Sequence, residues 1–307
     1  MAILEVNDLS ITFKQYTNGL KKKYIKVISS LNISVEAGEI LAVVGASGSG
    51  KSLLAHAILG ILPSNAKVSG TIKFNGETLT SARQEALRGR EIALVPQSVN
   101  YLDPLMRVGK QVRTSVKKGN EAKVQREVFE RYRLKPDVDK MYPFQLSGGM
   151  ARRTLLSTAM VSGARVIIAD EPTPGLDPAV INEVLNHFRD VADNGNAVML
   201  ITHDIESALK IADKIAVLYT GSTVEVAPAN NFTGNGEKLR HPYSKGLWRA
   251  LPQNEFIPIP GSQPHPSALP SGCLFEPRCV KATLECTKAQ PVMRELRNGI
   301  VRCIHAT

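Results

Sequence analysis

The chain has 307 residues, of which 43% are hydrophobic and 21% charged, and its formal net charge at pH 7 is +10. This length fits one large domain with an appendage or two modest domains, and the composition is ordinary for a globular protein. The longest apolar stretches, such as Val161–Ala169, are far shorter than the ~20 apolar residues of a membrane-spanning helix, so we expect no transmembrane segment.

The first forty residues are predicted to form short strands. Apolar residues cluster over 3–6 and 9–13, and they alternate with polar residues over 27–35. The beginning of the sequence lacks the basic and apolar regions of a secretory signal, which leads us to expect a protein kept in the cytoplasm. The excess of basic residues suits an anionic membrane surface or a solvated face, and no aromatic-and-basic pattern points to nucleic acid.

A complete phosphate-loop pattern, G-x-x-x-x-G-K-[ST], occupies residues 45–52. It follows a predicted strand over 40–44 and precedes a predicted helix over 53–62 that Pro63 ends. Its glycines let backbone N–H groups point at phosphate oxygens, and the helix adds the positive end of its dipole. We expect Lys51 to reach the β- and γ-phosphates and Ser52 to hold Mg²⁺. The predicted nucleotide-binding residues here are Gly45, Ser47, Gly48, Ser49, Gly50, Lys51, Ser52 and Leu53.

Further along, strands are predicted over 68–74 and 92–95, and the pattern between residues 97 and 163 becomes helical and charged, as over 121–133. After residue 165 strands and helices alternate. Their predicted ranges are 166–169, 179–192, 197–201, 205–211 and 215–219. Such alternation predicts an α/β fold with a mainly parallel sheet covered by helices.

Several short motifs follow the phosphate loop in a fixed order. They are Gln97 after a strand, the segment Leu146-Ser-Gly-Gly-Met150, the pair Asp170-Glu171 after a strand, Pro174-Gly-Leu-Asp177, and His203 after a strand. Together with the phosphate loop, these motifs resemble the ATPase subunits of ABC transporters over about residues 1–225. Each has its counterpart there: a Walker A loop, a Q-loop, an LSGG signature, a Walker B strand, a D-loop and a switch histidine.

The resemblance implies an ABC ATPase domain over residues 1–227, with a RecA-like parallel sheet, an antiparallel β subdomain and a helical subdomain at about 98–163. It implies that Ser52, Gln97 and Asp170 hold Mg²⁺. Glu171 would polarise the attacking water, and His203 would bond the γ-phosphate and hold Glu171. It also implies that an aromatic side chain, here Phe13, stacks on adenine, although Phe13 is equally suited to a plain core position.

The LSGG segment implies a dimer, because in this family the signature of one subunit closes over ATP bound by the other. The residues expected to act across this interface are Ser147, Gly148, Gly149 and Asp177. Departures from the usual family pattern occur at Met150, over 151–153 and over 174–175, and they affect the expected interface rather than the expected hydrolysis.

The tail, residues 228–307, is predicted to be a small irregular extension because five prolines between 258 and 270 exclude a regular helix or a central strand. The segments 241–252 and 259–273 resemble the peptide and nickel importer branch of the family. All four cysteines lie here, at Cys273, Cys279, Cys286 and Cys303. Four thiolates fit zinc or a 4Fe–4S cluster; the wide spacing and the resemblance favour the cluster, and unligated thiols are the third reading.

The sequence thus predicts an ATP-hydrolysing subunit of an importer for di- or oligopeptides, or alternatively for nickel or metal chelates. The resemblance implies a homologous ATPase partner in a heterodimer, two transmembrane permeases, an extracytoplasmic solute-binding protein and a peripheral location on the cytoplasmic face of the membrane. The rival hypotheses are a non-transport ABC ATPase acting on DNA or the ribosome, and a regulatory subunit that binds ATP without turnover.

Overall fold

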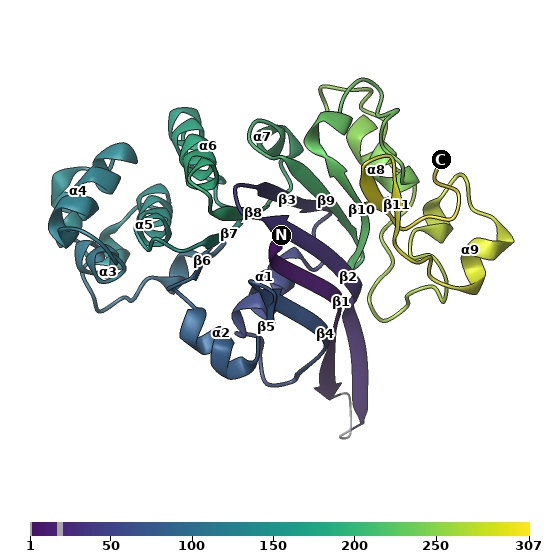
Figure 1. Ribbon diagram of the computed structural model, residues 1–307, viewed down its shortest axis with the longest axis horizontal. Helices are drawn as coiled ribbons and strands as arrows, with labels where there is room; N and C mark the ends of the chain where they lie inside the picture. Colours follow the sequence, from purple (N-terminus) through teal and green to yellow (C-terminus); the bar gives the residue numbers. More distant parts are fainter. Residues whose placement is uncertain (1, 17–20) are drawn as a thin grey trace.

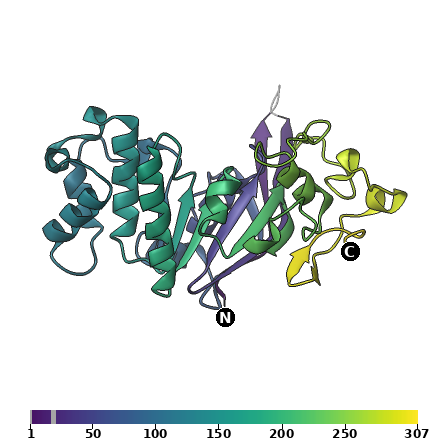
Figure 2. The same cartoon turned by 90° about the horizontal axis from the view of Figure 1, so that it is seen from above.

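The computed structural model describes residues 2–16 and 21–307. These residues form an eight-stranded sheet in the order β11-β12-β10-β9-β3-β8-β7-β6 and a four-stranded sheet in the order β2-β1-β4-β5. A group of helices lies at one end of the molecule and the C-terminal segment at the other, as both views show (Figures 1 and 2). In the described ranges, no helix combines the length and apolar character needed to cross a membrane.

The large sheet is parallel from β6 to β9 and antiparallel from β9 to β11. Its central strands are buried along their whole length, so their sequences read as unbroken apolar runs. The strands are β3 (Ile40–Gly45), β6 (Ile92–Val95), β7 (Val166–Asp170), β8 (Ala197–Ile201), β9 (Lys214–Tyr219), β10 (Ser222–Pro228), β11 (Arg294–Leu296) and β12 (Gly299–Val301).

The two faces of this sheet contribute to two separate hydrophobic cores, as the two-residue period of a strand requires. Ala42 and Val44 pack in the core that includes the residues of α6 (Pro178–Asp193). Leu41 and Val43 pack in the core that includes α1 (Lys51–Leu59) and the four-stranded sheet. α7 (Ile205–Leu209) adds to the first core. The predicted strand–helix alternation is therefore confirmed.

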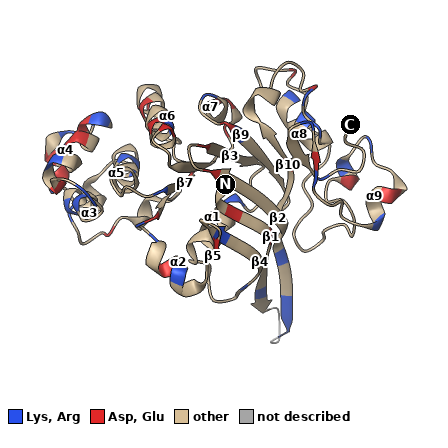
Figure 3. Cartoon of the chain, in the orientation of Figure 1, with Lys and Arg blue, Asp and Glu red and all other residues tan. Residues whose placement is uncertain are grey.

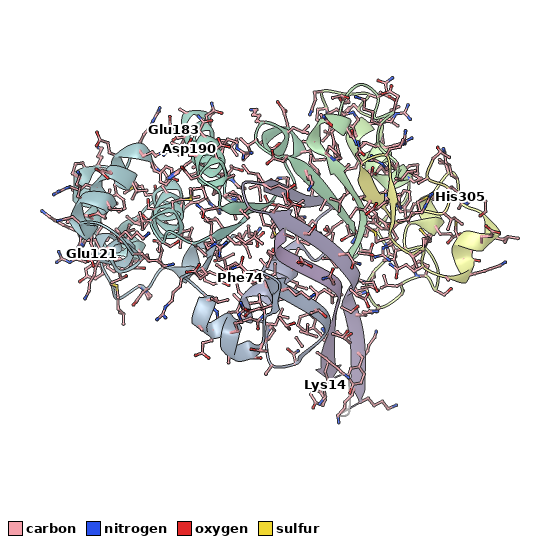
Figure 4. The ribbon with its side chains drawn as sticks, in the orientation of Figure 1. Lys14, Phe74, Glu121, Glu183, Asp190 and His305 are labelled. Carbon is pink, nitrogen blue, oxygen red and sulfur yellow. The ribbon has the colours of Figure 1, made fainter. Side chains whose placement is uncertain are left out.

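The four-stranded sheet contains β1 (Ala2–Tyr16), β2 (Lys22–Glu36), β4 (Ala66–Phe74) and β5 (Glu77–Thr78). The prediction of two separate strands over 3–6 and 9–13 is wrong, because β1 is one strand whose register shifts between Val6 and Leu9, with Asp8 at a φ of 51°. Such a bulge interrupts the alternation that marks a strand in sequence. The far end of the β1–β2 hairpin is basic and carries Lys14 (Figures 3 and 4).

The helical group contains α3 (Val108–Thr114), α4 (Glu121–Arg131) and α5 (Gly148–Met160), and α2 (Ser81–Leu87) lies nearer the four-stranded sheet (Figure 1). Short 3₁₀ helices occupy Val99–Tyr101, Pro136–Lys140 and Pro143–Gln145. Two contacts join the group to α6. The Tyr132 hydroxyl lies 2.6 Å from His187 Nδ1, and the Arg131 guanidinium lies 2.6 Å from Asp190 Oδ2. Asp190 and Glu183 mark this side of α6 in Figure 4.

The C-terminal segment is more ordered than the sequence predicts. It contains α8 (Pro242–Arg249), α9 (Leu284–Lys288) and 3₁₀ turns at Ala229–Asn231 and Glu276–Arg278. Its final hairpin, β11–β12, extends the large sheet, because β12 pairs with β10 at Glu225↔Val301. The proline-rich stretch between residues 258 and 270 forms no helix or strand, as predicted.

Buried charges attach this segment to the sheet. Glu225 of β10 is fully buried and accepts hydrogen bonds from the backbone N–H groups of Arg240 and His241, each at 2.9 Å. The Arg240 guanidinium also pairs with Glu225. Arg302 donates to the carbonyl oxygens of Thr223 in β10 and Ser30 in β2. A buried carboxylate satisfied by several donors holds its surroundings in one arrangement, since losing a donor would leave charge unpaired.

His241 makes this attachment sensitive to acid. Its Nδ1 accepts the N–H of Tyr243 at 3.0 Å, which requires a neutral ring, and burial together with the charge of Arg302 lowers its pKa from 6.5 to about 3. Between pH 6.5 and pH 3, His241 is protonated in the unfolded chain but neutral in the folded chain. The free energy of unfolding therefore decreases as the pH falls through this range.

We predict that His241→Asn, which keeps a side-chain acceptor at the helix N-terminus, makes the free energy of unfolding less dependent on pH. The slope of this free energy against pH should decrease by the contribution of about one proton. Urea denaturation between pH 4 and 7 measures the slope. His187, whose pKa burial lowers to about 4, contributes in the same window, so the difference between wild type and variant isolates His241. Equal slopes in the two proteins would contradict the prediction.

Candidate nucleotide-binding site

The loop between β3 and α1 begins at a position where only glycine fits. A side-chain carbon at Gly45 would lie 2.4 Å from the carbonyl oxygen of Leu218 in the neighbouring strand β9. At its other end, Gly50 precedes α1 with a φ of 90°, and no described side chain caps the helix. The first N–H groups of α1 are therefore available to an anion, and the helix dipole favours negative charge there.

An open cavity of about 760 Å³ lies against this loop. Its volume falls in the range of roughly 300–1,000 Å³ that is usual for small-molecule sites. The cavity joins elements that are far apart in sequence: β2, the phosphate loop, the segment after β6, the helix α5, and the ends of β7 and β8. Its lining residues are Val27, Ser47, Gly48, Ser49, Gly50, Lys51, Ser52, Leu53, Gln97, Arg152, Asp170, Glu171, Pro174 and His203.

Lys51 is held against its own loop. Its Nζ donates to the carbonyl oxygens of Gly45 at 2.8 Å and Ala46 at 3.2 Å. Burial lowers its pKa, whereas the charges of Glu171 and Asp170 raise it. The ammonium group thus lies where the loop and two carboxylates meet, the place from which it can neutralise phosphate oxygens.

Asp170 and Ser52 form the second part of the site. Asp170 ends β7, and burial raises the pKa of its carboxyl group, whereas the neighbouring Ser52 side chain lowers it. Its Oδ1 is buried and has no hydrogen-bond partner among the described residues. A buried carboxylate oxygen left unpaired beside a serine hydroxyl is a donor set that suits Mg²⁺, which prefers oxygen ligands.

Glu171 and His203 form the third part. Glu171 has a φ of 49°, a left-handed conformation that is costly for a residue with a side chain, and its N–H donates to the carbonyl oxygen of Ile201 at 2.9 Å. Its Oε1 lies 2.9 Å from His203 Nδ1, and its buried Oε2 has no partner among the described residues. This strained backbone places a fixed carboxylate at the cavity with one oxygen available to a reactant.

Arg152 is a site residue that the sequence reasoning missed. It lies on α5, and its guanidinium donates to the backbone carbonyl oxygens of Glu171 at 2.6 Å and Gln97 at 3.0 Å. It therefore links the helical group to the end of β7 and to the segment after β6. One signal was present: Arg152 follows Gly148 by four residues, so it shares the face of α5 on which the signature begins.

Other predicted residues lie outside this cavity. Phe13 is on β1, partly buried against the second core, and it is absent from the lining. Ser147 precedes α5 and accepts the N–H of Met150 at 3.3 Å, while its neighbour Gly148 is exposed. Asp177 is exposed before α6. The signature and D-loop residues, Ser147, Gly148, Gly149 and Asp177, thus lie at surface positions rather than at the chain's own phosphate loop.

The four cysteines are free thiols. Burial, together with the smaller effect of the three other thiols, raises the pKa of Cys273 to about 11. The Nε2 atom of His305 lies 2.9 Å from the Thr283 hydroxyl oxygen. Across residues 2–16 and 21–307, no group of three or more His, Cys, Asp or Glu side chains is arranged to hold a metal ion. The prediction of a metal-binding extension is thus not supported by the side-chain arrangement.

Comparison with known sequences gives two family matches. Residues 28–174 match the family described as ABC transporter, and residues 224–286 match the family described as oligopeptide/dipeptide transporter, C-terminal region. A putative peptide import ATP-binding protein of Brucella melitensis is 34% identical over 98% of this chain and 94% of its own length. The oligopeptide transport ATP-binding protein OppD of Salmonella typhimurium is 36% identical over 94% of this chain and 90% of its own length.

Solved structures share the fold of the core. An ATP-binding subunit of an ABC transporter aligns with a TM-score of 0.62 and 24% identity over 75% of this chain and 91% of that chain. A dimeric ATP-binding cassette in a post-hydrolysis state, bound to ADP and Pi, aligns with a TM-score of 0.64 and 22% identity over 74% of this chain and 98% of that chain.

We predict that Arg152→Gln lowers the rate of ATP hydrolysis by about tenfold or more, because it removes two hydrogen bonds from a charged donor that fix Glu171 and Gln97. Arg152→Lys should fall between the variant and wild type, since lysine keeps the charge but not the forked geometry.

Steady-state hydrolysis and melting temperature are measured together for these proteins. Arg126→Gln, at an exposed position on α4, is the matched control and should behave as wild type. A normal rate in Arg152→Gln would show that the two carbonyl contacts have no part in catalysis.

Proposed function

The chain belongs to the ABC transporter family, among its peptide import ATP-binding proteins, and from this premise we propose that it energises a membrane importer of di- and oligopeptides. One observation carries the ATPase part of this proposal. A single cavity brings together Lys51, the Ser52–Asp170 pair and the Glu171–His203 pair. These are the charge-neutralising, metal-holding and water-orienting groups that phosphoryl transfer needs.

The residues divide the chemistry among themselves. The loop N–H groups and Lys51 bind the β- and γ-phosphates and spread the charge that develops during transfer. Glu171, with Oε1 held by His203, presents Oε2 to the water that attacks the γ-phosphorus and aligns that water with the leaving oxygen. Mg²⁺, held by Ser52, Asp170 and Gln97, would neutralise charge on the β- and γ-phosphate oxygens.

The signature and D-loop residues belong to a dimer in this proposal. Ser147, Gly148 and Gly149 stand at the N-terminus of the thirteen-residue helix α5, where phosphate is favoured, yet they lie outside the chain's own cavity. We infer that they close over ATP bound by a homologous partner subunit, in a heterodimer, and that Asp177 meets the same interface. Phe13 or a neighbouring aromatic would stack on adenine when the two subunits come together.

The remaining assignments follow from the relatives. Their names specify peptide import, which favours peptides over nickel or metal chelates and over a role on DNA or the ribosome. The proposed partners are two membrane permeases that receive the chain at the Q-loop and helical group, and an extracytoplasmic solute-binding protein that delivers peptide. This arrangement makes the chain a peripheral protein on the cytoplasmic face of the membrane.

One further proposal concerns a group bound by the cysteine segment. Four free thiols lie in the stretch 273–303, and from their number we infer that a 4Fe–4S cluster, or alternatively zinc, is held by Cys273, Cys279, Cys286 and Cys303. No catalytic step depends on it. Such a group would contribute to the folding of a segment that has few apolar residues of its own.

We predict that Glu171→Gln lowers ATP hydrolysis by at least about 100-fold while ATP binding persists, because the amide cannot accept a proton from water. The assay uses the complete complex in lipid vesicles. Hydrolysis by the wild-type complex should rise when the solute-binding protein carries peptide and stay constant with a nickel chelate. Glu206→Gln, an exposed carboxylate on α7, is the control. Unchanged hydrolysis in Glu171→Gln would refute the catalytic assignment, and stimulation by nickel alone would refute the peptide assignment.

For the cysteines we predict that protein purified without oxygen is brown, with broad visible absorption, and that Cys279→Ser removes the colour. Metal analysis of the same sample separates iron from zinc. A colourless protein with zinc would replace the cluster by a zinc site, and one with neither metal would leave four structural thiols.

A further inference from the structure

A second cavity, of about 250 Å³, lies between α8 and the segment that follows this helix. One wall is a single face of α8, because Pro242, Lys245 and Arg249 are spaced by three and four residues along it. The other walls come from the stretch 257–260 and from residues between 275 and 281. No residue lines both this cavity and the nucleotide-binding cavity, so the two are separate sites.

Positive charge dominates the lining of this cavity. The described residues that line it include no Asp or Glu and four cations, which are Lys245, Arg249, Arg278 and Lys281. One carboxylate lies close by, because Glu255 Oε1 pairs with Arg249 Nε at 2.7 Å. The other three cations form no ion pair with a carboxylate within the described ranges. The charge of the cavity is therefore largely uncompensated by the chain itself.

Arg278 is fixed by neutral groups. Its guanidinium donates to the carbonyl oxygens of Pro260 at 2.8 Å and Ile259 at 3.1 Å, and to the Tyr219 hydroxyl at 3.4 Å. These bonds hold the guanidinium at the cavity wall but supply no negative charge to balance it.

Lys245 is half-buried and lies among like charges. Burial lowers the pKa of its ammonium group, the charges of Lys281 and Arg297 lower it further, and the charges of Glu225 and Glu237 oppose them more weakly. Its ammonium forms no hydrogen bond or ion pair in the part of the chain that the structure describes. A half-buried cation without a counter-ion is costly, and an anion bound in the cavity would relieve that cost.

Most of the remaining lining is apolar. Phe275 is buried, and α8 packs closely on the opposite wall at Gly246, where a side-chain carbon would lie 3.1 Å from Ile259 Cγ1. Two further lining side chains, Val280 and Ile257, are 90% and 52% exposed. Exposed apolar side chains beside a cationic cavity suit a ligand that joins an anionic group to an apolar body.

We propose that this cavity binds a phosphate group carried on an apolar body, with Lys245, Arg278 and Lys281 as the cations that hold the phosphate. A phosphate monoester carries about −1.5 to −2 charge at pH 7 and so balances up to two of the three cations, whereas a carboxylate balances one. The volume is below the roughly 300–1,000 Å³ of usual small-molecule sites, which favours a ligand smaller than a nucleotide. A soluble monoester and a phospholipid headgroup share this chemistry.

The first test measures the binding of hexyl phosphate to the full chain by calorimetry. ADP and Mg²⁺ are present in excess, so that the phosphate loop is already occupied. Heptanoate carries the same hexyl chain with a single charge, and inorganic phosphate carries no chain. We expect hexyl phosphate to bind at least about tenfold more tightly than either of them, because only this ligand satisfies both the cations and the apolar walls. No binding, or equal affinities for the three ligands, would overturn the proposal.

Variants then locate the binding. Lys281→Gln removes an exposed cation of the cavity, so it should leave the melting temperature unchanged and weaken hexyl phosphate binding by about tenfold. Lys245→Gln should weaken it similarly. Lys288→Gln, at an exposed position on α9 outside the cavity, is the matched control and should bind as wild type. Equal affinities in Lys281→Gln and Lys288→Gln would show that the anion binds elsewhere, and the proposal would fail.

Vesicles separate the two sources of the phosphate group. The chain is sedimented with phosphatidylcholine vesicles that contain or lack phosphatidic acid. Binding that requires phosphatidic acid and falls in Lys281→Gln but not in Lys288→Gln assigns the cavity to a phospholipid headgroup. Hexyl phosphate binding without vesicle binding assigns it to a soluble monoester. An equal loss of vesicle binding in the two variants would be a general effect of the chain's positive charge and would exclude the phospholipid.

Discussion

The site depends on the parallel pairing of β7, β8 and β3. Parallel strands place their carboxyl ends at one edge of a sheet, and the register pairs Asp170 with Ile201 and Val43 with Ile201. The phosphate loop, the two carboxylates and the histidine all follow directly from these three strand ends. These groups lie between positions 45 and 203, more than 150 residues apart in the sequence. The parallel strand ends bring them to the same edge of the sheet. The strain at Glu171 is tolerated because the preceding residue, Asp170, ends β7 and the N–H of Glu171 itself donates to Ile201 in β8.

Much of this could be predicted from the sequence, and the reason is burial. The bounds of β6 and β8 match the apolar runs over 92–95 and 197–201, because strands covered on both faces have nothing but apolar residues. β10 was missed because polar residues interrupt it, and Glu225 is fully buried within it. β12 was missed because its three residues are too few to show an alternating pattern. Arg152 was missed for another reason. Its partners are backbone carbonyls 19 and 55 residues away, and no local pattern encodes such a contact.

The C-terminal segment is integrated with the ATPase core rather than appended to it. The solved cassettes that share the fold cover about three quarters of the chain, 75% and 74% in the two cases, and a second family model matches residues 224–286 of this segment. Its attachment uses a buried carboxylate, a buried arginine and paired strands.

The last hairpin has a consequence of another kind. β12 covers the outer side of β10, and β11 covers β12 with a strand of only three residues. A chain cut short before residue 294 would leave the backbone of β10 bare, with open donors and acceptors that invite a strand from a neighbouring molecule. Residues 294–307 therefore also protect the edge of β10 from intermolecular strand pairing. Because β11 has only three residues, the new edge that it forms is too short to favour such pairing.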